Sequence, residues 1–426
     1  MALNQTKPIL TAGFVPRPDD AIDLSSLGRV LVIMLRHHGD VLLTTPVYAA
    51  LQASAPHVEI DALIYRETLP MLEFSPHLAQ VHCIDRTWKR QGLGTQIANE
   101  WRLLRTLAAR RYDLVIHLTN HPRGAWLVRL LKSGRFKPRW SVAPKLREPS
   151  RLWNGSFSHL YSNSSSVGSG SPLGRRHVAE QNLDALRRLG ISIGPAPPLK
   201  MVPGVDGERD ADNYLKRHSV DGDFIFVQPT SRWLFKCWSV ERNAELLSAL
   251  LERGETIVLG CAPDTRERAM IRAIVDALCV GSNAALPENF KLADDGGTLN
   301  RLAALIGRAK LFIGIDSAPM HIAAAMGTPI VALFGPSGEA NWGPWHGGSQ
   351  FESEASPRSR VITSAAYACR PCGQDGCGGS KVSDCLTTLP VAQVLRAVDD
   401  LLRDASSTRA SVRVSPQRAG ADRAAP

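Results

Sequence analysis

The segment 312–335 combines a short apolar run, a turn of small and polar residues, an alanine-rich stretch and a second apolar run. This pattern predicts a strand that ends at Asp316, a helix that starts within the next few residues and stops at Gly327, and a second strand. The helix start would then lie at the mouth of a sheet, where unpaired N–H groups and the helix dipole favour a phosphate or diphosphate. Asp316, Ser317 and His321 would surround that anion.

The length and composition exclude several classes of protein. The chain has 426 residues, of which 44% are hydrophobic, which predicts two cores joined by a crossing segment. No apolar run approaches the ~18 residues of a membrane span, and the first residues do not resemble a signal peptide. We therefore expect a cytoplasmic protein. Its eight cysteines should be reduced thiols or metal ligands rather than a disulfide framework.

The positive charge of the chain is concentrated in one stretch. Residues 86–151 contain 16 Lys and Arg against three acidic residues, a net charge of +13 that exceeds the +10 of the whole chain. Such a stretch can meet nucleic acid, anionic lipid head groups or a phosphorylated substrate, or it can be a solvated helix face with a basic loop. No RNA-binding or helix-turn-helix signature accompanies it, so we do not expect a nucleic-acid partner.

Apolar runs alternate with helical patterns along most of the chain, which predicts an α/β fold with parallel sheets covered by helices. The predicted strands are 29–35, 58–65, 112–118, 224–228, 256–260 and 311–315. The predicted helices are 41–54, 97–111, 177–189, 240–253, 265–278 and 298–309. The chain thus contains two similar α/β halves without a close sequence repeat.

Proline, serine and glycine mark the predicted boundaries. A Pro-rich connection at 194–198 places the domain boundary near 195–215. The Ser/Gly-rich stretch 144–176 is predicted to be a long mobile loop. The resulting domain prediction is a disordered tail 1–27, a Rossmann-like domain 28–200, a second Rossmann-like domain 205–388, a helix 389–405 and a disordered tail 406–426.

Three turns carry polar residues suited to chemistry. Asp40 follows the first strand, where it can cap the next helix or act as a general base toward a hydroxyl. After the strand 224–228, Thr230 and Ser231 can donate to phosphate oxygens. Arg232 or, better, Lys236 can stabilise charge on a diphosphate leaving group. Otherwise this is a basic turn packed by Trp233 and Trp238.

A third turn, at 260–265, carries an acid. Asp264, or Glu267 one turn later, can bind ribose hydroxyls as acids do in dinucleotide folds, although capping of the following helix also explains Asp264. A cluster of four thiols lies further on, at Cys369, Cys372, Cys377 and Cys385. They can build a closed structural zinc site or remain reduced and unligated. No catalytic metal site is indicated.

Common enzyme signatures are missing from the sequence. It contains no Walker phosphate loop, G-x-G-x-x-G, G-x-S-x-G or H-E-x-x-H motif. This disfavours ATPases, dinucleotide-dependent dehydrogenases, α/β-hydrolases and zincins.

Taken together, the segments 29–46, 228–238, 312–321 and 369–385 resemble the bacterial heptosyltransferases of glycosyltransferase family 9, especially the lipopolysaccharide heptosyltransferase III type. The resemblance covers residues 28–400. It implies a GT-B fold, in which two Rossmann-like domains face each other across a cleft. The first would bind the acceptor and the second the donor, ADP-heptose. The basic stretch would meet the anionic inner core of lipopolysaccharide, at the inner face of the cytoplasmic membrane.

The resemblance also implies an inverting, metal-independent transfer that needs no cofactor. Asp40 would be the general base and Lys236 the cation that holds the ADP leaving group. The donor site would be lined by Thr230, Ser231, Asp316, Ser317, Ala318 and His321, with Asp264 as a further member.

Two other functions remain open. One is a family 9 transferase with another acceptor, a protein Ser or Thr or another surface glycan. The other is a non-catalytic protein that binds a nucleotide sugar, which would not need Asp40 as a base facing Lys236.

Overall fold

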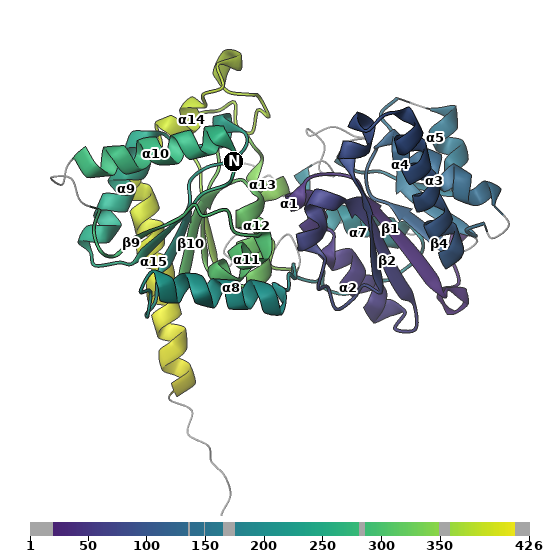
Figure 1. The fold of residues 1–426 in the computed structure, drawn as a ribbon, viewed down its shortest axis with the longest axis horizontal. Helices are drawn as coiled ribbons and strands as arrows, with labels where there is room; N and C mark the ends of the chain where they lie inside the picture. Colours follow the sequence, from purple (N-terminus) through teal and green to yellow (C-terminus); the bar gives the residue numbers. More distant parts are fainter. Residues whose placement is uncertain are drawn as a thin grey trace, which may run out of the picture. The chain divides into compact units, whose positions relative to one another are not determined.

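The computed structural model of the chain describes residues 20–134, 137–148, 150–164, 175–280, 286–348 and 358–413, with side chains to 404. The contacts divide it into two compact units. The first comprises residues up to Lys200 together with a short piece at Gly347 and Gly348, and the second comprises the rest. Figure 1 shows that each unit is a sheet surrounded by helices. No described helix combines the length and apolar composition that crossing a membrane requires.

The first unit is built on a parallel six-stranded sheet in the order β3-β2-β1-β4-β5-β6. Its strands are β1 Arg29–Met34, β2 Glu59–Tyr65, β3 Gln80–Ile84, β4 Leu114–His117, β5 Trp140–Pro144 and β6 His159–Tyr161. Its helices are α1 His38–Leu42, α2 Thr45–Ser54, α3 Leu93–Arg110, α4 Pro122–Ser133, α5 Arg151–Ser156 and α7 Val178–Arg188. Helices α3, α4 and α5 share one hydrophobic cluster with the strands, through Leu107, Val128 and Trp153.

The second unit repeats this topology, with the strand order β12-β11-β10-β7-β8-β9. Its strands are β7 Ile225–Gln228, β8 Ile257–Gly260, β9 Phe290–Ala293, β10 Leu311–Ile315, β11 Ile330–Leu333 and β12 Ser359–Ile362. Its helices are α8 Gly204–Arg217, α9 Val240–Glu252, α10 Thr265–Val280, α11 Leu299–Arg308, α12 Ala318–Met326, α13 Glu339–Trp342, α14 Asp384–Thr387 and α15 Val391–Arg413. Both sheets therefore have the order of a six-stranded dinucleotide-binding fold.

The predicted strand–helix–strand at 312–335 is confirmed. All five residues of β10 are buried, as expected for a central parallel strand. Helix α12 runs from Ala318 to Met326, and Gly327 follows it with a φ of +76°, a left-handed conformation that glycine adopts without strain. Strand β11 then pairs with β10 in parallel, with Phe312 opposite Ile330.

Three predictions about irregular segments are wrong. Of the predicted tail 1–27, residues 20–27 are held against the first unit, because Leu27 is buried, Asp20 forms an ion pair with Arg188, and the His159 ring is hydrogen-bonded to the Asp20 carbonyl; residues 1–19 lie outside the described part. The predicted loop 144–176 contains α5 and β6, which are held by the buried side chains of Trp153, Phe157 and Tyr161; residues 165–174 lie outside the described part. Helix α15 continues past residue 405 to Arg413, since no proline interrupts it before Pro416.

Candidate active site

The polar turns of the second unit meet at the point where its strand order reverses. Strand β7 lies between β10 and β8, so the carboxyl ends of β7 and β10 border the switch point where open α/β sheets bind ligands. Gln228 is paired with Gly314 in the parallel register. Two residues further along each strand, Thr230 and Asp316 therefore lie at the same edge. The fold brings these sequence-predicted residues together.

Lys236 is the cation of this edge. It ends a short 3-10 helix, Leu234–Lys236, and its Nζ donates to the Asp316 carboxylate at 2.6 Å. The lysine side chain is 24% exposed and that of Asp316 8%, so the ion pair is only partly open to solvent. Arg232, by contrast, is exposed and stacks over the exposed ring of Trp233. Of these two cations, Lys236 is thus the one that pairs with Asp316.

The same turn also packs against the core of the second unit, through one of its two tryptophans only. Trp238 is 1% exposed and its indole N–H donates to the carbonyl of Leu389. Trp233 is 48% exposed and contributes no buried packing of comparable extent. Packing therefore accounts for the position of Trp238. The position of Lys236 is fixed instead by its ion pair with Asp316.

The first residues of α12, at this edge of the sheet, have small side chains. Ser317 precedes the helix, but its hydroxyl donates to the carbonyl of Ile315 rather than capping the helix. Ala318 is the first helical residue and Pro319 has no N–H. The positive end of the α12 dipole lies beside Lys236 and Asp316, an arrangement suited to an anion.

His321 lies one turn inside α12 and is completely enclosed. It is 3% exposed, and its Nδ1 is a buried atom without a hydrogen-bond partner among the described residues. Burial lowers its pKa to about 4; nearby Asp316 acts in the opposite direction and Lys236 in the same direction. The imidazole is therefore neutral at physiological pH, and it can orient a ligand or its neighbours but cannot supply a second positive charge.

Thr230 and Ser231 are placed at the edge but are engaged locally. The Thr230 hydroxyl accepts a hydrogen bond from the Gln228 amide and also bonds to the Glu267 carboxyl. The Ser231 hydroxyl accepts the N–H of Trp233. Both residues are buried, at 1% and 7% exposure. To donate to a bound phosphate, Thr230 would have to give up its bond to Glu267, whereas Ser231 only accepts in its bond with Trp233 and keeps its O–H as a donor.

Of the two acids considered for the third turn, the structure places Glu267 beside Thr230. Burial raises the pKa of Glu267, and the hydrogen bond with Thr230 opposes that rise. Asp264 instead accepts hydrogen bonds from the backbone N–H groups of Arg266 and Glu267 at the start of α10. Asp264 therefore caps the helix, and Glu267 is the acid that contacts the other turns.

Gln228 was not singled out from the sequence. Its side chain and its carbonyl each lie close against a glycine of a neighbouring strand. A Cβ on Gly260 would lie 2.3 Å from the Gln228 Oε1, and a Cβ on Gly314 would lie 3.1 Å from its backbone oxygen. Gly260 therefore leaves room for the Gln228 side chain that reaches Thr230, and Gly314 leaves room for the Gln228 carbonyl. The glycine that ends the otherwise apolar strand β8 could have indicated this close approach from the sequence.

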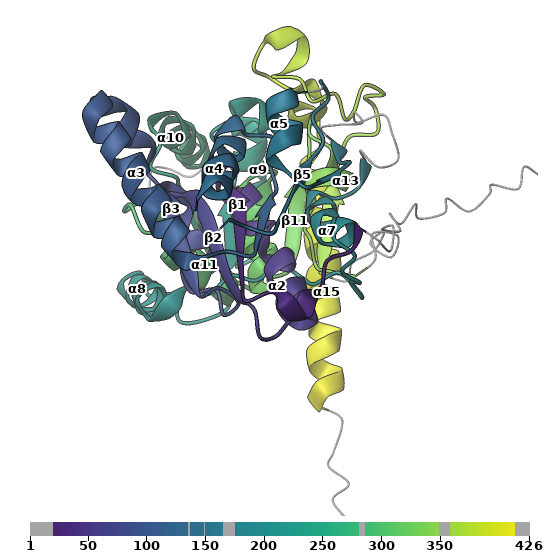
Figure 2. The ribbon, with the colours of Figure 1, turned by 90° about the vertical axis from the view of Figure 1, so that its right-hand side faces the viewer.

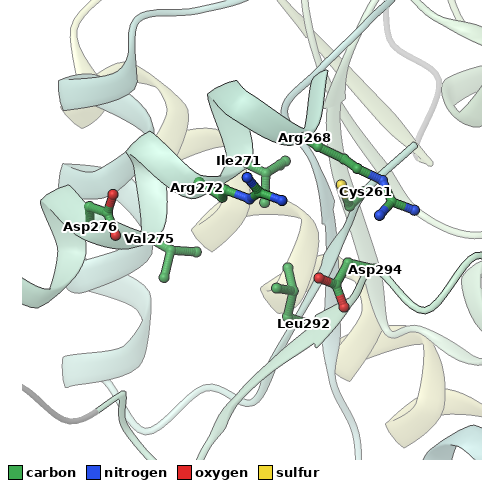
Figure 3. Close-up of a pocket in the computed structure, with 8 residues that line it drawn as sticks. All are labelled: Cys261, Arg268, Ile271, Arg272, Val275, Asp276, Leu292 and Asp294. Carbon is green, nitrogen blue, oxygen red and sulfur yellow. The ribbon is translucent and has the colours of Figure 1, made fainter. Parts of the chain in front are cut away.

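A pocket lies between helix α10 and strand β9, next to the turn that joins β8 to α10. Its lining comprises Cys261, Arg268, Ile271, Arg272, Val275, Asp276, Leu292 and Asp294. Figure 3 shows Arg268, Cys261 and Asp294 at one end of this hollow and Val275 and Asp276 at the other. None of the sequence-predicted site residues lines it, although Arg268 adjoins Glu267 in α10.

In the first unit, Asp40 lies in α1, just beyond the carboxyl end of β1. Strand β1 borders the reversal point of its own sheet. Asp40 is not the N-cap residue itself, because α1 begins at His38 and His37 precedes it, but as the third residue of the helix it takes part in capping, so the capping role is confirmed in this form. The Asp40 carboxylate accepts the backbone N–H of His37 at 3.2 Å. Burial raises the pKa of Asp40, against the opposing charge of Arg36, which makes the carboxylate a stronger base.

Several cations gather around His121, which follows β4, and one of them, Arg36, also acts on Asp40. Burial lowers the pKa of His121, and so do the charges of Arg123, Arg36, Lys89 and Arg86 around it. The His121 ring forms a hydrogen bond with the hydroxyl of Tyr65, and Arg86 lies over the Tyr65 ring. These residues were not singled out from sequence, although most of them fall in or next to the basic stretch. Their charges can hold an anionic group.

The four clustered cysteines are free thiols in the structure. Cys369, Cys372 and Cys377 are exposed and Cys385 is buried. Burial raises the pKa of Cys385, and the other three thiols act in the same direction. Within the described part of the chain, no group of three or more His, Cys, Asp or Glu side chains has the arrangement of a metal site.

Comparisons with known proteins show the family. The family model described as glycosyltransferase family 9 (heptosyltransferase) matches residues 100–365. Lipopolysaccharide heptosyltransferase 3 of Escherichia coli is 32% identical over 373 residues, which cover 86% of this chain and 97% of that protein.

Solved structures show the same fold. The glycosyl transferase family 9 protein of Veillonella parvula has a TM-score of 0.72 at 23% identity, covering 90% of this chain and 99% of that one. The E. coli ADP-heptose lps heptosyltransferase II has a TM-score of 0.66 at 19% identity, covering 89% and 99%. With two Rossmann-like units on parallel six-stranded sheets, the chain has the GT-B fold, and it is a glycosyltransferase that belongs to family 9.

Proposed function

We propose that this protein transfers heptose from ADP-heptose to the inner core of lipopolysaccharide. The observation that carries the proposal is the Lys236–Asp316 pair at the start of α12, at the switch point of the second sheet. A cation beside a helix N-terminus suits a sugar donor whose leaving group is a diphosphate. A relative that matches 86% of this chain is named as a lipopolysaccharide heptosyltransferase, which supports the sugar and the acceptor.

The proposed reaction is a single displacement that inverts the anomeric centre. Asp40 takes the proton from an acceptor hydroxyl while that oxygen forms a bond to the anomeric carbon of the heptose. The bond from this carbon to the diphosphate oxygen breaks, and ADP leaves with the bonding electron pair. Lys236 and the start of α12 stabilise the charge on ADP, and no metal ion is required.

The remaining predicted residues have supporting roles in this proposal. Ser317 and Ala318 would present the helix start to the phosphates, and His321 would orient the groups around it as a neutral ring. Thr230 and Ser231 would line the donor side, with Glu267 a better placed ribose partner than Asp264. The raised pKa of Asp40 supports its role as the base.

The acceptor side is supported by charge. The cations around His121 lie at the same end of the first sheet as Asp40. An inner core that carries carboxylates and phosphates would be held there by charge-assisted hydrogen bonds. The protein would then work as a peripheral protein on the cytoplasmic face of the inner membrane, where this acceptor is assembled.

The test is transfer from ADP-heptose to purified heptose-bearing inner-core lipopolysaccharide in the presence of EDTA, followed by the mass of the product. We expect the wild type to add one heptose and Asp40→Asn to add none while binding ADP normally. Asp206→Asn is the matched control, because Asp206 is an exposed carboxylate that pairs with Arg209 on α8. It should retain full activity.

The other outcomes separate the alternatives. If neither wild type nor variant adds heptose although both bind ADP, other acceptors, such as a protein Ser or Thr or another surface glycan, take the place of lipopolysaccharide. Equal transfer by Asp40→Asn would reject Asp40 as the base. Loss of transfer with EDTA would reject the metal-independent reaction.

A further inference from the structure

Helix α3 carries an exposed apolar stripe. Leu93, Ile97 and Trp101 are 79%, 67% and 60% exposed. They are spaced four residues apart, so their side chains follow one another along the same face of the helix. Leu103 and Leu107, on another face, are buried and hold α3 to the sheet. The stripe therefore contributes nothing to the core of the unit.

The neighbouring helix α4 extends this apolar surface. Trp126 and Leu130 are 53% and 49% exposed and are also four residues apart. An ion pair between Arg123 and Glu100 joins the two helices, which lie side by side in Figures 1 and 2. Both pack on the same face of the sheet, so their exposed faces point away from it. Of the twelve exposed large apolar side chains in the described residues, five lie on these two helices.

Cations border the apolar stripe. Arg105 follows Trp101 at the same four-residue spacing, Arg129 adjoins Leu130, and Lys89 and Arg90 precede α3. All four are exposed, and none forms an ion pair with a carboxylate of the described residues. The two helices contain a single acid, Glu100, and it is already paired with Arg123. The surface is thus apolar at its centre and positive at its margin.

We propose that the exposed face of α3 and α4 docks on an anionic lipid surface. Tryptophan and leucine insert favourably at the boundary between head groups and acyl chains, and the surrounding arginines and lysines attract anionic head groups. A second copy of this chain is a poorer occupant, because it would bring two positive margins face to face. The proposal concerns this surface alone and does not depend on the sugar transfer.

The experiment measures binding of the full chain to vesicles of phosphatidylethanolamine with phosphatidylglycerol, and to vesicles of phosphatidylcholine alone. We expect binding to the anionic vesicles that weakens with salt. Ile97→Gln/Trp101→Gln should bind more than about tenfold more weakly. Arg105→Gln/Arg129→Gln should lose about fivefold per cation removed. Val205→Gln is the matched control, since Val205 is an equally exposed apolar residue, at 81%, on α8, and it should bind like the wild type.

A spectroscopic readout locates the contact. Brominated lipids should quench the tryptophan fluorescence of the bound wild type, and Trp101→Phe/Trp126→Phe should remove most of this quenching while binding persists. Circular dichroism and ADP binding establish that each variant is folded. Failure of the folded wild type to bind anionic vesicles, or undiminished binding by the stripe variant, would overturn the proposal. A wild-type dimer that the stripe variant converts to a monomer would assign the surface to a second copy instead.

Discussion

The Lys236–Asp316 pair makes a quantitative prediction, because its two partners are unequally buried. In Lys236→Met the side chain keeps its length but loses its charge. The Asp316 carboxylate, 8% exposed, is then left without its 2.6 Å partner. Breaking a fully buried pair costs about 3–5 kcal/mol. Because the lysine is 24% exposed and water can partly replace it, we expect a loss of about 1–2 kcal/mol in the free energy of unfolding.

The reciprocal variant should be milder. In Asp316→Asn the freed ammonium group can turn toward solvent, so the expected loss is less than about 1 kcal/mol. The double variant Lys236→Met/Asp316→Asn leaves no unpaired charge and should be about 1 kcal/mol more stable than Lys236→Met alone. Urea unfolding, followed by circular dichroism, measures all three.

The same three variants test the donor site. Lys236→Met should weaken ADP binding about 10–100-fold, because it removes a charge-assisted hydrogen bond and leaves the Asp316 carboxylate facing the phosphates. The double variant should recover part of that loss, and isothermal titration calorimetry measures both. Wild-type ADP affinity in Lys236→Met would refute the leaving-group role. A double variant no better than Lys236→Met in either assay would refute the coupling of the pair.

Three further predictions concern the first unit. Since burial raises the pKa of Asp40, the acid limb of kcat/KM should lie above the ordinary aspartate pKa of about 3.9; Asp40→Asn should remove this limb and lower kcat by about 10²–10⁴-fold, as a pH–rate series measures. Gly124→Ala places a Cβ 2.2 Å from the buried His117 ring and should lower the free energy of unfolding by about 1–2 kcal/mol, as thermal melts measure. Gly94→Ala, on α3 with no atom close to the new Cβ, should raise it slightly in the same measurement. Burial would raise the pKa of Asp61, but hydrogen bonds from His82, Arg110 and Tyr112 lower it to about 2. Its stabilisation of about 2 kcal/mol is therefore complete above about pH 4 and lost as the pH falls toward 2. Urea unfolding across that range should show this loss in the wild type and not in Asp61→Asn.

Local patterns in the sequence were sufficient for the central elements of both sheets. The all-apolar run of β10 and the glycine at 327 predicted the strand, the helix and the stop correctly, because each depends on neighbouring residues only. The edge elements were missed for the same reason. Strand β6 has three residues, and its burial depends on aromatic side chains that reach it from other elements.

The candidate site was predicted as a set of turns, and the fold decided how they combine. Periodicity and residue type singled out Asp40, Lys236 and the start of α12 as candidates. Contacts across the chain pair Lys236, and not Arg232, with Asp316, and they place Glu267 beside Thr230 while Asp264 accepts backbone N–H groups of α10. Asp40 is the third residue of its helix, where it accepts the backbone N–H of His37.

The sequence by itself determined the alternation of strands and helices, the parallel sheets and the family motifs, since these follow from periodicity and from glycine and proline at fixed positions. The tertiary structure alone decided which charges meet and which side chains lose water. Lys236 and Asp316 are 80 positions apart and pair because β7 and β10 are adjacent strands. Burial, which raises the pKa of Asp40 and lowers that of His321, depends on packing from distant segments. The exposed stripe of α3 likewise exists because the core of its unit is complete without it.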